Sequence, residues 1–211
     1  MFDPFRDFST AGYLRNKHKE QDVRIIKKIE HEVFARHLPK AIQHLSSRKT
    51  IAYEDFLAVH RILFSEFYPW AGQDRSITTP NIGVSKAGIQ FCQPEDVRRA
   101  VDEGLRLAQE KGKMPESPGL VMGFFAYGHP FLDGNGRTML LVHLDLAYRA
   151  GFSIAWADTN KANYLAALSD EIKKPGRGIL DAYLLQFKRD RLERSEWGKS
   201  VLSMKGLDGL D

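Results

Sequence analysis

Residues 129–137 read HPFLDGNGR and combine several chemically useful groups within nine positions. His129 titrates near neutral pH in its ordinary state and could accept a proton from an incoming hydroxyl. Asp133 offers a hard carboxylate oxygen, the kind of ligand that holds Mg²⁺ together with substrate phosphates. Arg137 adds a planar fork of donors that suits phosphate oxygens. A base, a metal ligand and a phosphate-binding cation together predict phosphoryl or nucleotidyl transfer.

The backbone of Gly134, Asn135 and Gly136 is suited to the same chemistry. Glycine permits positive φ angles that turn successive N–H groups into one concavity, and such a nest at a helix N-terminus binds phosphate. A cation in the first helical turn is unfavourable by roughly 0.3–1 kcal/mol, so the position of Arg137 is better explained if an anion fills the site. Each residue alone has an ordinary explanation, such as a tight turn, an interior histidine or a helix cap. Their joint occurrence favours a site.

Helices are expected on both sides of this loop. Residues 119–128 carry no charge and are apolar on every side, which is typical of a buried helix. Residues 138–150 are mostly apolar, and Gly151 is expected to cap that helix in the left-handed conformation. Apolar periodicity predicts further helices from residue 22 to about Pro39, where proline should end the helix, and over 50–67, 94–107, 161–173 and about 179–191.

One stretch, residues 75–85, alternates β-branched and small polar residues and predicts a strand or hairpin. Pro80 and Gly83 within it favour an edge or flap over the centre of a sheet. The predicted class is therefore all-α with one short β flap. Residues 1–191 are expected to form a single domain, with its core over about 56–187, a helical region over about 18–50 before it, and a tail of doubtful order over 192–211.

Composition narrows the setting of the protein. The chain has 211 residues, a net charge of +4 and a single cysteine, Cys92, which excludes an internal disulfide and fits a reducing compartment. The N-terminus lacks the pattern of a signal peptide, and no charge-free stretch is long enough to span a bilayer, so we expect a cytoplasmic, soluble protein without membrane contact. No motif predicts nucleic-acid binding. The charged run over 17–28 is expected to be a solvated helix face, and His60 a packing or surface histidine.

The loop at 129–137 resembles the signature of the Fic family, H-P-F-x-[D/E]-G-N-G-R-x-x-R, at every specified position through Arg137. Residues 68–75, YPWAGQDR, also look like the segment that leads to the flap in that family. The resemblance implies a Fic-fold helical bundle with a β-hairpin flap over the active site. It also implies an enzyme that transfers AMP from ATP, with Mg²⁺, to a Ser, Thr or Tyr hydroxyl of a target protein.

The resemblance implies a role for each matched position. His129 would be the general base and Asp133 the Mg²⁺ ligand, while Arg137 would neutralise the leaving phosphates. Asn135 and the amides of Gly134 and Gly136 would hold phosphate oxygens. Less closely matched residues that would bind the nucleobase are Asn163 and Tyr164, together with Asn160. The target would pair by strand addition with the flap, whose candidate docking residues are Ile77, Thr78, Thr79 and Val84.

One position departs from the family pattern. The second arginine of the signature falls at Leu140. The resemblance implies that this arginine holds the γ-phosphate and pairs with an inhibitory glutamate from a small helix. Residues 50–55, TIAYED, match the inhibitory pattern except at its last position, and they are interpreted as the start of a helix. Built-in inhibition of the usual kind is therefore not expected. A small inhibitor protein of the antitoxin type and export into a host cell are both compatible with the sequence.

Three hypotheses follow. The first is a protein adenylyltransferase, toxin- or effector-like. The second is a Fic enzyme with another donor, transferring UMP, GMP or phosphocholine. The third is a weakly active or non-catalytic regulatory protein that acts by binding.

The departure at Leu140 generates a prediction. If this leucine replaces a γ-phosphate contact, Leu140→Arg should tighten ATP binding or change the preferred donor, because it restores a cation to the signature. Calorimetric titration with a panel of nucleotides measures both quantities. Unchanged affinity and preference would show that the position serves core packing alone.

Overall fold

The computed structural model describes residues 2–86, 88–204 and 207. Helices dominate this part of the chain, and its strands form two small antiparallel pairs. The predicted all-α class with a short β hairpin is confirmed. The second strand pair, far from the hairpin in sequence, was not predicted.

The elements follow in chain order. The helices are α1 (Phe8–Ala11), α2 (Val23–Ser46), α3 (Tyr53–Phe64), α4 (Arg75–Thr78), α5 (Val97–Gln109), α6 (Lys113–Glu116), α7 (Pro118–Gly128), α8 (Asn135–Arg149), α9 (Lys161–Lys173), α10 (Ile179–Leu185) and α11 (Trp197–Leu202). The strands are β1 (Ser85–Lys86), β2 (Ile89–Gln90), β3 (Phe152–Ile154) and β4 (Lys188–Asp190).

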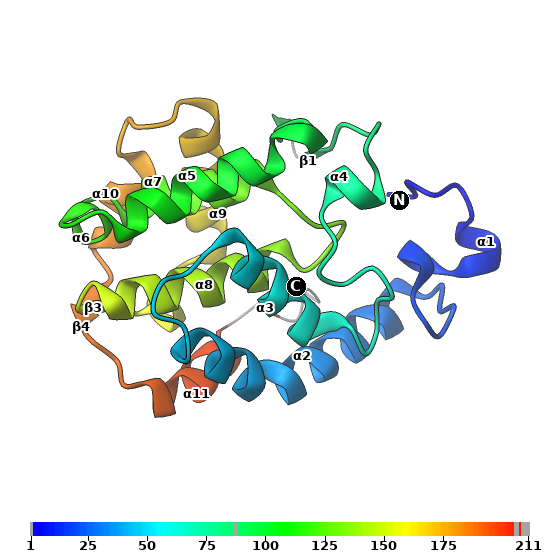
Figure 1. The fold of residues 1–211 in the computed structure, drawn as a ribbon, viewed down its shortest axis with the longest axis horizontal. Helices are drawn as coiled ribbons and strands as arrows, with labels where there is room; N and C mark the ends of the chain where they lie inside the picture. Colours follow the sequence, from blue (N-terminus) through cyan, green and yellow to red (C-terminus); the bar gives the residue numbers. More distant parts are fainter. Residues whose placement is uncertain (1, 87, 205–206, 208–211) are drawn as a thin grey trace.

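Helix α8 lies at the centre of the molecule, with α5 and α7 on one side and α2 and α3 on the other (Figure 1). Its residues are buried almost without interruption as far as Ala147, as its apolar sequence predicts. Asp181 fixes the start of α7, because its Oδ1 accepts the backbone N–H groups of Gly119 at 2.6 Å and Leu120 at 3.2 Å. Gly151 has φ +88° and follows α8, so the predicted left-handed cap is confirmed.

Helix α2 does not end at Pro39, and that prediction is wrong: the helix runs through the proline to Ser46. An interior proline removes one hydrogen bond and clashes with a carbonyl, at a cost of about 3 kcal/mol or more. Leu38, Ala41 and Leu45 around and beyond it are fully buried in the core. Burial of each leucine contributes about 1.5–3 kcal/mol, which offsets the proline and keeps the helix continuous.

The strand prediction over residues 75–85 is also wrong in position. Residues 75–78 form the short helix α4, because Asp74 caps it by accepting the N–H of Ser76 at 2.9 Å. The hairpin lies later, with Ser85 paired to Gln90 and Lys86 to Ile89. Local alternation could not reveal the cap or the burial of Arg75, which decide the helix.

The remaining differences lie toward the C-terminus. The helix predicted to reach about residue 191 ends at Leu185, and Lys188–Asp190 pairs with β3 instead. Part of the segment 192–211 packs on the core: Trp197 of α11 is fully buried and donates its indole N–H to Leu192 O at 3.0 Å. Residues 205–206 and 208–211 lie outside the described part of the chain.

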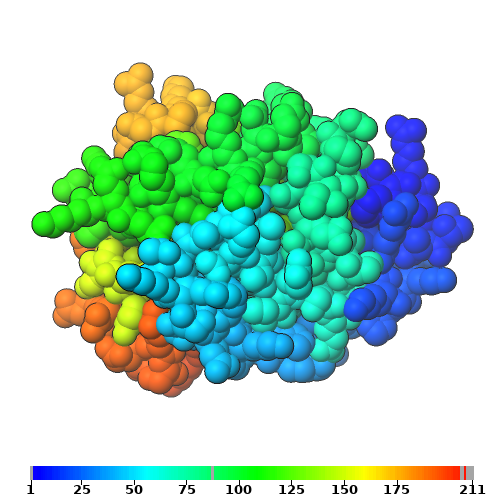
Figure 2. Space-filling model, in the orientation of Figure 1, coloured from blue at the N-terminus to red at the C-terminus, as the bar shows by residue number. Residues whose placement is uncertain are grey.

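The N-terminal segment covers one end of the molecule, beside the turn that follows α3 (Figure 2). Hydrogen bonds attach it there: Lys17 donates its backbone N–H to Phe67 O and its ammonium to Ser65 O, and Trp70 donates its indole N–H to Leu14 O. Within the described residues, no helix is both long and apolar enough to cross a membrane.

Candidate active site

The loop at 129–137 joins α7 to α8 through two left-handed residues. His129, the residue after α7, has φ +40°, which is uncommon for a residue with a bulky side chain. Gly134, which precedes α8, has φ +76°, and a Cβ atom there would lie 2.7 Å from the ring of Phe64. Only glycine fits this position, for conformational and for steric reasons. The expected positive φ is found at Gly134, whereas Gly136 lies within α8 and is not among the described glycines with positive φ.

Asn135 closes the loop upon itself. Its side-chain oxygen accepts the N–H of Phe131 at 2.9 Å, and its side-chain nitrogen donates to Phe131 O at 2.7 Å. Phe131 is fully buried and anchors the loop in the core. The amide of Asn135 is therefore engaged within the loop, and its contact with phosphate stays a prediction.

His60 holds the same loop from α3. Its Nδ1 accepts the N–H of Gly72 at 2.9 Å, so Nε2 carries the proton and donates to Asp133 O at 3.0 Å. The ring stacks on Phe131 with centroids 3.7 Å apart. Burial lowers the pKa of His60 to about 3, so the ring is neutral. The interpretation of His60 as a packing histidine is correct for its burial. The sequence did not indicate that His60 also positions the loop.

Arg75 fixes the backbone around His129. Its Nε donates to His129 O at 2.7 Å, and its Nη2 donates to Gly128 O at 3.2 Å and to Cys92 O at 2.9 Å. Its own backbone N–H donates to Pro130 O. A buried guanidinium thus joins the turn after α7 to the segment that follows the hairpin.

The imidazole of His129 stacks on Phe91, with centroids 3.9 Å apart. Burial, followed by the charges of Arg75 and Lys86, lowers the pKa of His129 to about 3. This differs from the expectation of titration near neutrality, because the sequence shows neither the burial nor the two cations. The ring is neutral at physiological pH and can accept a proton.

Helix α2 contributes two charged side chains to the loop. Lys27 Nζ lies 2.9 Å from Asp133 Oδ2 and 3.1 Å from Glu30 Oε2, and Glu30 also pairs with Arg137. Burial opposes the charge of Asp133, but Lys27 and Arg137 outweigh it and hold the pKa of Asp133 below its usual value. The four side chains form one alternating network of charges.

Arg137 faces α2 and α3. Beyond its pair with Glu30, its guanidinium lies 4.7 Å from the ring centroid of Phe64 and 5.6 Å from that of Phe34. Its side chain is only 9% exposed. A contact between Arg137 and phosphate stays a prediction, and it would require Glu30 to release the guanidinium.

A pocket of about 580 Å³ opens on another face of α8. It is lined by Gly136 of the loop and by Leu140, the position at which the sequence departs from the Fic signature. Asn160 and Tyr164 also line it, as predicted for the nucleobase side, whereas Asn163 is exposed and is absent from the lining. The other residues around it are Met139, Trp156, Ala157, Asp158, Thr159, Lys161, Leu165, Leu168, Met204 and Leu207.

The structure separates the four candidate docking residues. Ile77 and Thr78 belong to α4, and Thr79 is buried. Val84 precedes β1 and accepts the N–H of Phe91, so it extends the hairpin. The exposed hairpin is thus connected to His129 through Phe91, and Val84 alone of these candidates lies at the hairpin.

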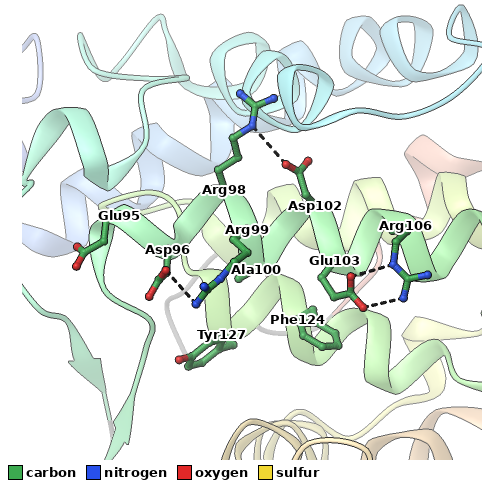
Figure 3. Close-up of a pocket in the computed structure, with 10 residues that line it drawn as sticks. All are labelled: Glu95, Asp96, Arg98, Arg99, Ala100, Asp102, Glu103, Arg106, Phe124 and Tyr127. Atoms are coloured by element: carbon green, nitrogen blue, oxygen red, sulfur yellow. Dashed lines mark hydrogen bonds and ion pairs between the residues drawn. The ribbon is translucent and has the colours of Figure 1, made fainter.

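A larger hollow lies elsewhere on the surface, between α5 and α7, and measures about 890 Å³ (Figure 3). Its charged side chains pair with one another, as in Asp96–Arg99 at 3.0 Å and Glu103–Arg106 at 2.8 Å. No residue of the loop lines it. Its size alone does not make it the active site.

The donor set near the loop fits Mg²⁺ bound together with a nucleotide. Asp133 supplies an ionised carboxylate, and Mg²⁺ commonly takes one or two carboxylates plus substrate phosphates. Within the described residues no cluster of three or more His, Cys, Asp or Glu could hold a metal ion by itself. A site that depends on the phosphates is consistent with this arrangement.

Comparison with known proteins identifies the family resemblance independently. Residues 50–147 match the model of the Fic/DOC family. The chain is 28% identical over 147 residues to the probable protein adenylyltransferase y4lH of Sinorhizobium fredii, which covers 65% of this chain and 66% of that protein. It is 29% identical over 101 residues to the protein adenylyltransferase VbhT of Bartonella schoenbuchensis, covering 46% of this chain and 21% of that protein.

The fold agrees with solved structures. The BepC protein of Bartonella tribocorum, a VirB-translocated effector determined with bound AMPPNP, superposes with a TM-score of 0.66 at 16% identity, covering 84% of this chain and 92% of that one. The chain has the Fic fold, and the resemblance inferred from residues 129–137 is confirmed. It spans somewhat less than two thirds of y4lH and about a fifth of VbhT.

Four positioning residues escaped the sequence analysis: Lys27, Glu30, His60 and Arg75. Lys27 lies in the charged run that was interpreted as a solvated face, yet its side chain is only 21% exposed and that of Glu30 is fully buried. For Arg75 a signal existed, because it ends the family-like segment 68–75. For Lys27 and Glu30 no local signal existed.

The double hydrogen bond of His60 generates a prediction. His60→Phe keeps a ring against Phe131 but leaves the N–H of Gly72 and the carbonyl of Asp133 without partners, which should lower the free energy of unfolding by about 1–3 kcal/mol. Urea titration measures the change. His18→Phe, at an exposed histidine, is the matched control and should leave stability nearly unchanged. A loss at His60 no larger than at His18 would contradict the positioning role.

Proposed function

We propose that the protein is a protein adenylyltransferase that transfers AMP from ATP to a hydroxyl of a target protein. The observation that carries the proposal is the position of His129. Its neutral ring contacts Phe91 beside the exposed hairpin, while Gly136 of the same loop lines the pocket of about 580 Å³. One loop thus connects a surface for an extended peptide with a pocket for a nucleotide.

The comparisons support the same activity. Two curated relatives are named as adenylyltransferases, and a structural relative was determined with AMPPNP. A target segment would add as a strand to the hairpin of β1 and β2, which presents an exposed edge. The docking surface therefore moves from the predicted residues 77–84 to Val84 and the hairpin.

The reaction follows from these positions. The target hydroxyl would donate its proton to the imidazole of His129 as its oxygen bonds to the α-phosphorus. The bond between the α-phosphorus and the bridging oxygen would break, so that pyrophosphate leaves and AMP stays on the target. Mg²⁺, held by Asp133 and the phosphates, would neutralise charge on the leaving group. Asn135, Arg75 and His60 would keep the loop in one conformation throughout.

A second candidate function rests on Leu140. The leucine is 5% exposed and lines the pocket where the signature places an arginine. A pocket without that cation favours donors with fewer terminal phosphate charges. Phosphocholine transfer is the alternative that this argument supports, whereas UTP and GTP carry the same terminal phosphates as ATP, so transfer of UMP or GMP stays a prediction. An inhibitor protein of the antitoxin type, a cytoplasmic location and export stay predictions.

The transfer reaction is tested directly. Wild-type protein incubated with Mg-ATP and a lysate of candidate targets should add one AMP to a target, measured by mass spectrometry, and His129→Ala should not. His18→Ala is the matched control and should retain transfer, because that side chain is exposed and outside the loop. Target masses that are alike for wild type and His129→Ala with every donor would contradict catalysis by this loop.

The low pKa of His129 gives a second test. Because burial and two cations lower the pKa to about 3, the ring should stay neutral from pH 8 down to pH 5 and gain its proton only below that range. NMR of ¹³C-labelled histidine rings follows the titration, and the signal missing in His129→Ala provides the assignment. A midpoint near 6.5 for that signal would show that the base is not held in the buried, neutral state.

A further inference from the structure

Of the cations Arg137, Arg75 and Lys27 around the loop, Lys27 is held by the fewest of the described contacts. Arg137 is fixed by Glu30 and by two aromatic rings. Arg75 is fixed by the carbonyls of three residues. Lys27 has a flexible stem and a partly exposed side chain, and its hydrogen bonds within the described part of the chain go to the carboxylates of Asp133 and Glu30.

The position of Lys27 matters because the signature lacks its second arginine. Leu140 stands where the signature has the arginine that the resemblance assigns to the terminal phosphates, and Arg137 faces α2 and α3. The pocket lining does include a cation, Lys161, at the start of α9. The ammonium of Lys27 lies 2.9 Å from Asp133, the carboxylate proposed to act beside the phosphates. Lysine binds phosphate as a compact point charge with three donors, and it does not need the planar geometry of arginine.

We propose that Lys27 is a nucleotide-binding residue whose ammonium leaves Asp133 and contacts the terminal phosphates of the donor, supplying the charge that Leu140 does not. The inference rests on the proposed nucleotide site. Binding of Mg²⁺ to Asp133 would compete with the ammonium for the same carboxylate and release it toward the phosphates. Glu30 would remain paired with Arg137, so the helix would stay attached to the loop.

The protonation of Lys27 is consistent with this role. Burial opposes the charge, but Asp133 and Glu30 outweigh it and raise the pKa of Lys27 above its usual value. The residue thus carries a full positive charge at physiological pH. A purely structural role makes a different prediction. If Lys27 only held α2 against the loop, its loss would lower stability and weaken the binding of all nucleotides equally.

The experiment compares nucleotides that differ in their terminal phosphates. Calorimetric titration of wild type, Lys27→Met and Lys27→Gln with Mg-ATP should show affinity lowered about tenfold to a hundredfold in both variants, because one charge-assisted contact is lost. Affinity for AMP should change less than about twofold, because AMP lacks the terminal phosphates that Lys27 would contact. Lys28→Met removes the same charge from an exposed neighbour on α2 and should bind ATP as the wild type does.

A rescue variant tests the link to Leu140. Leu140→Arg in the Lys27→Met background should recover most of the lost ATP affinity, since it returns a cation to the phosphates. An equal loss for ATP and AMP, or no loss for either, would overturn the proposal. So would a double variant that binds ATP as weakly as Lys27→Met.

One measurement uses only the wild-type protein, so it does not depend on whether a variant folds. In wild-type protein labelled at the lysine side chains, the NMR signal of Lys27 should shift on addition of Mg-ATP and shift little on addition of AMP. An unmoved signal in the presence of bound ATP would refute the role of Lys27 while leaving the nucleotide site intact. Failure of the wild type to bind any nucleotide would instead refute the proposed function, and this inference with it.

Discussion

The buried ionic network between α2 and the loop is the constraint on which the arrangement of the site depends. Glu30 is fully buried, and an unpaired buried carboxylate would be strongly unfavourable. Arg137 and Lys27 compensate it, and Lys27 extends the network to Asp133. The pairs Glu30–Arg137 and Lys27–Asp133 each join residues more than a hundred positions apart in the chain. These ion pairs therefore form only when α2 packs against the loop. The continuity of α2 through Pro39 has a separate cause, the burial of Leu38, Ala41 and Leu45 in the core.

A second set of contacts fixes the base without using its ring. Arg75 binds the carbonyls around His129, and the left-handed turn then directs the imidazole toward Phe91. His60 holds the other end of the loop through Asp133 O. These contacts are to backbone or to an aromatic face, and within the described residues no hydrogen bond to a ring nitrogen of His129 is found. A neutral, half-buried base beside an exposed hairpin is the result.

The chain has the Fic fold, but the charged residues around its loop differ from those of the Fic signature. The motif arginine that remains, Arg137, is directed into the interface of α2 and α3. The second is replaced by Leu140, which lines the pocket. The positive charge nearest to the carboxylate of the loop comes instead from Lys27, on a helix that precedes the residues matched by the family model.

Local sequence determined the elements whose causes are local. The apolar runs around residues 119–128 and 138–150, the glycines at 134 and 151, and the HPFLDGNGR loop itself specify two buried helices and the turn between them, since periodicity and glycine conformations act over a few residues. Tertiary structure decided the rest. It carried α2 past Pro39, placed residues 75–78 in a capped helix, and moved the hairpin to residues 85–90. It also turned Lys27, Glu30, His60 and Arg75 into supports of the loop, because each acts through a partner distant in sequence, and such pairings leave no periodic trace in a single chain.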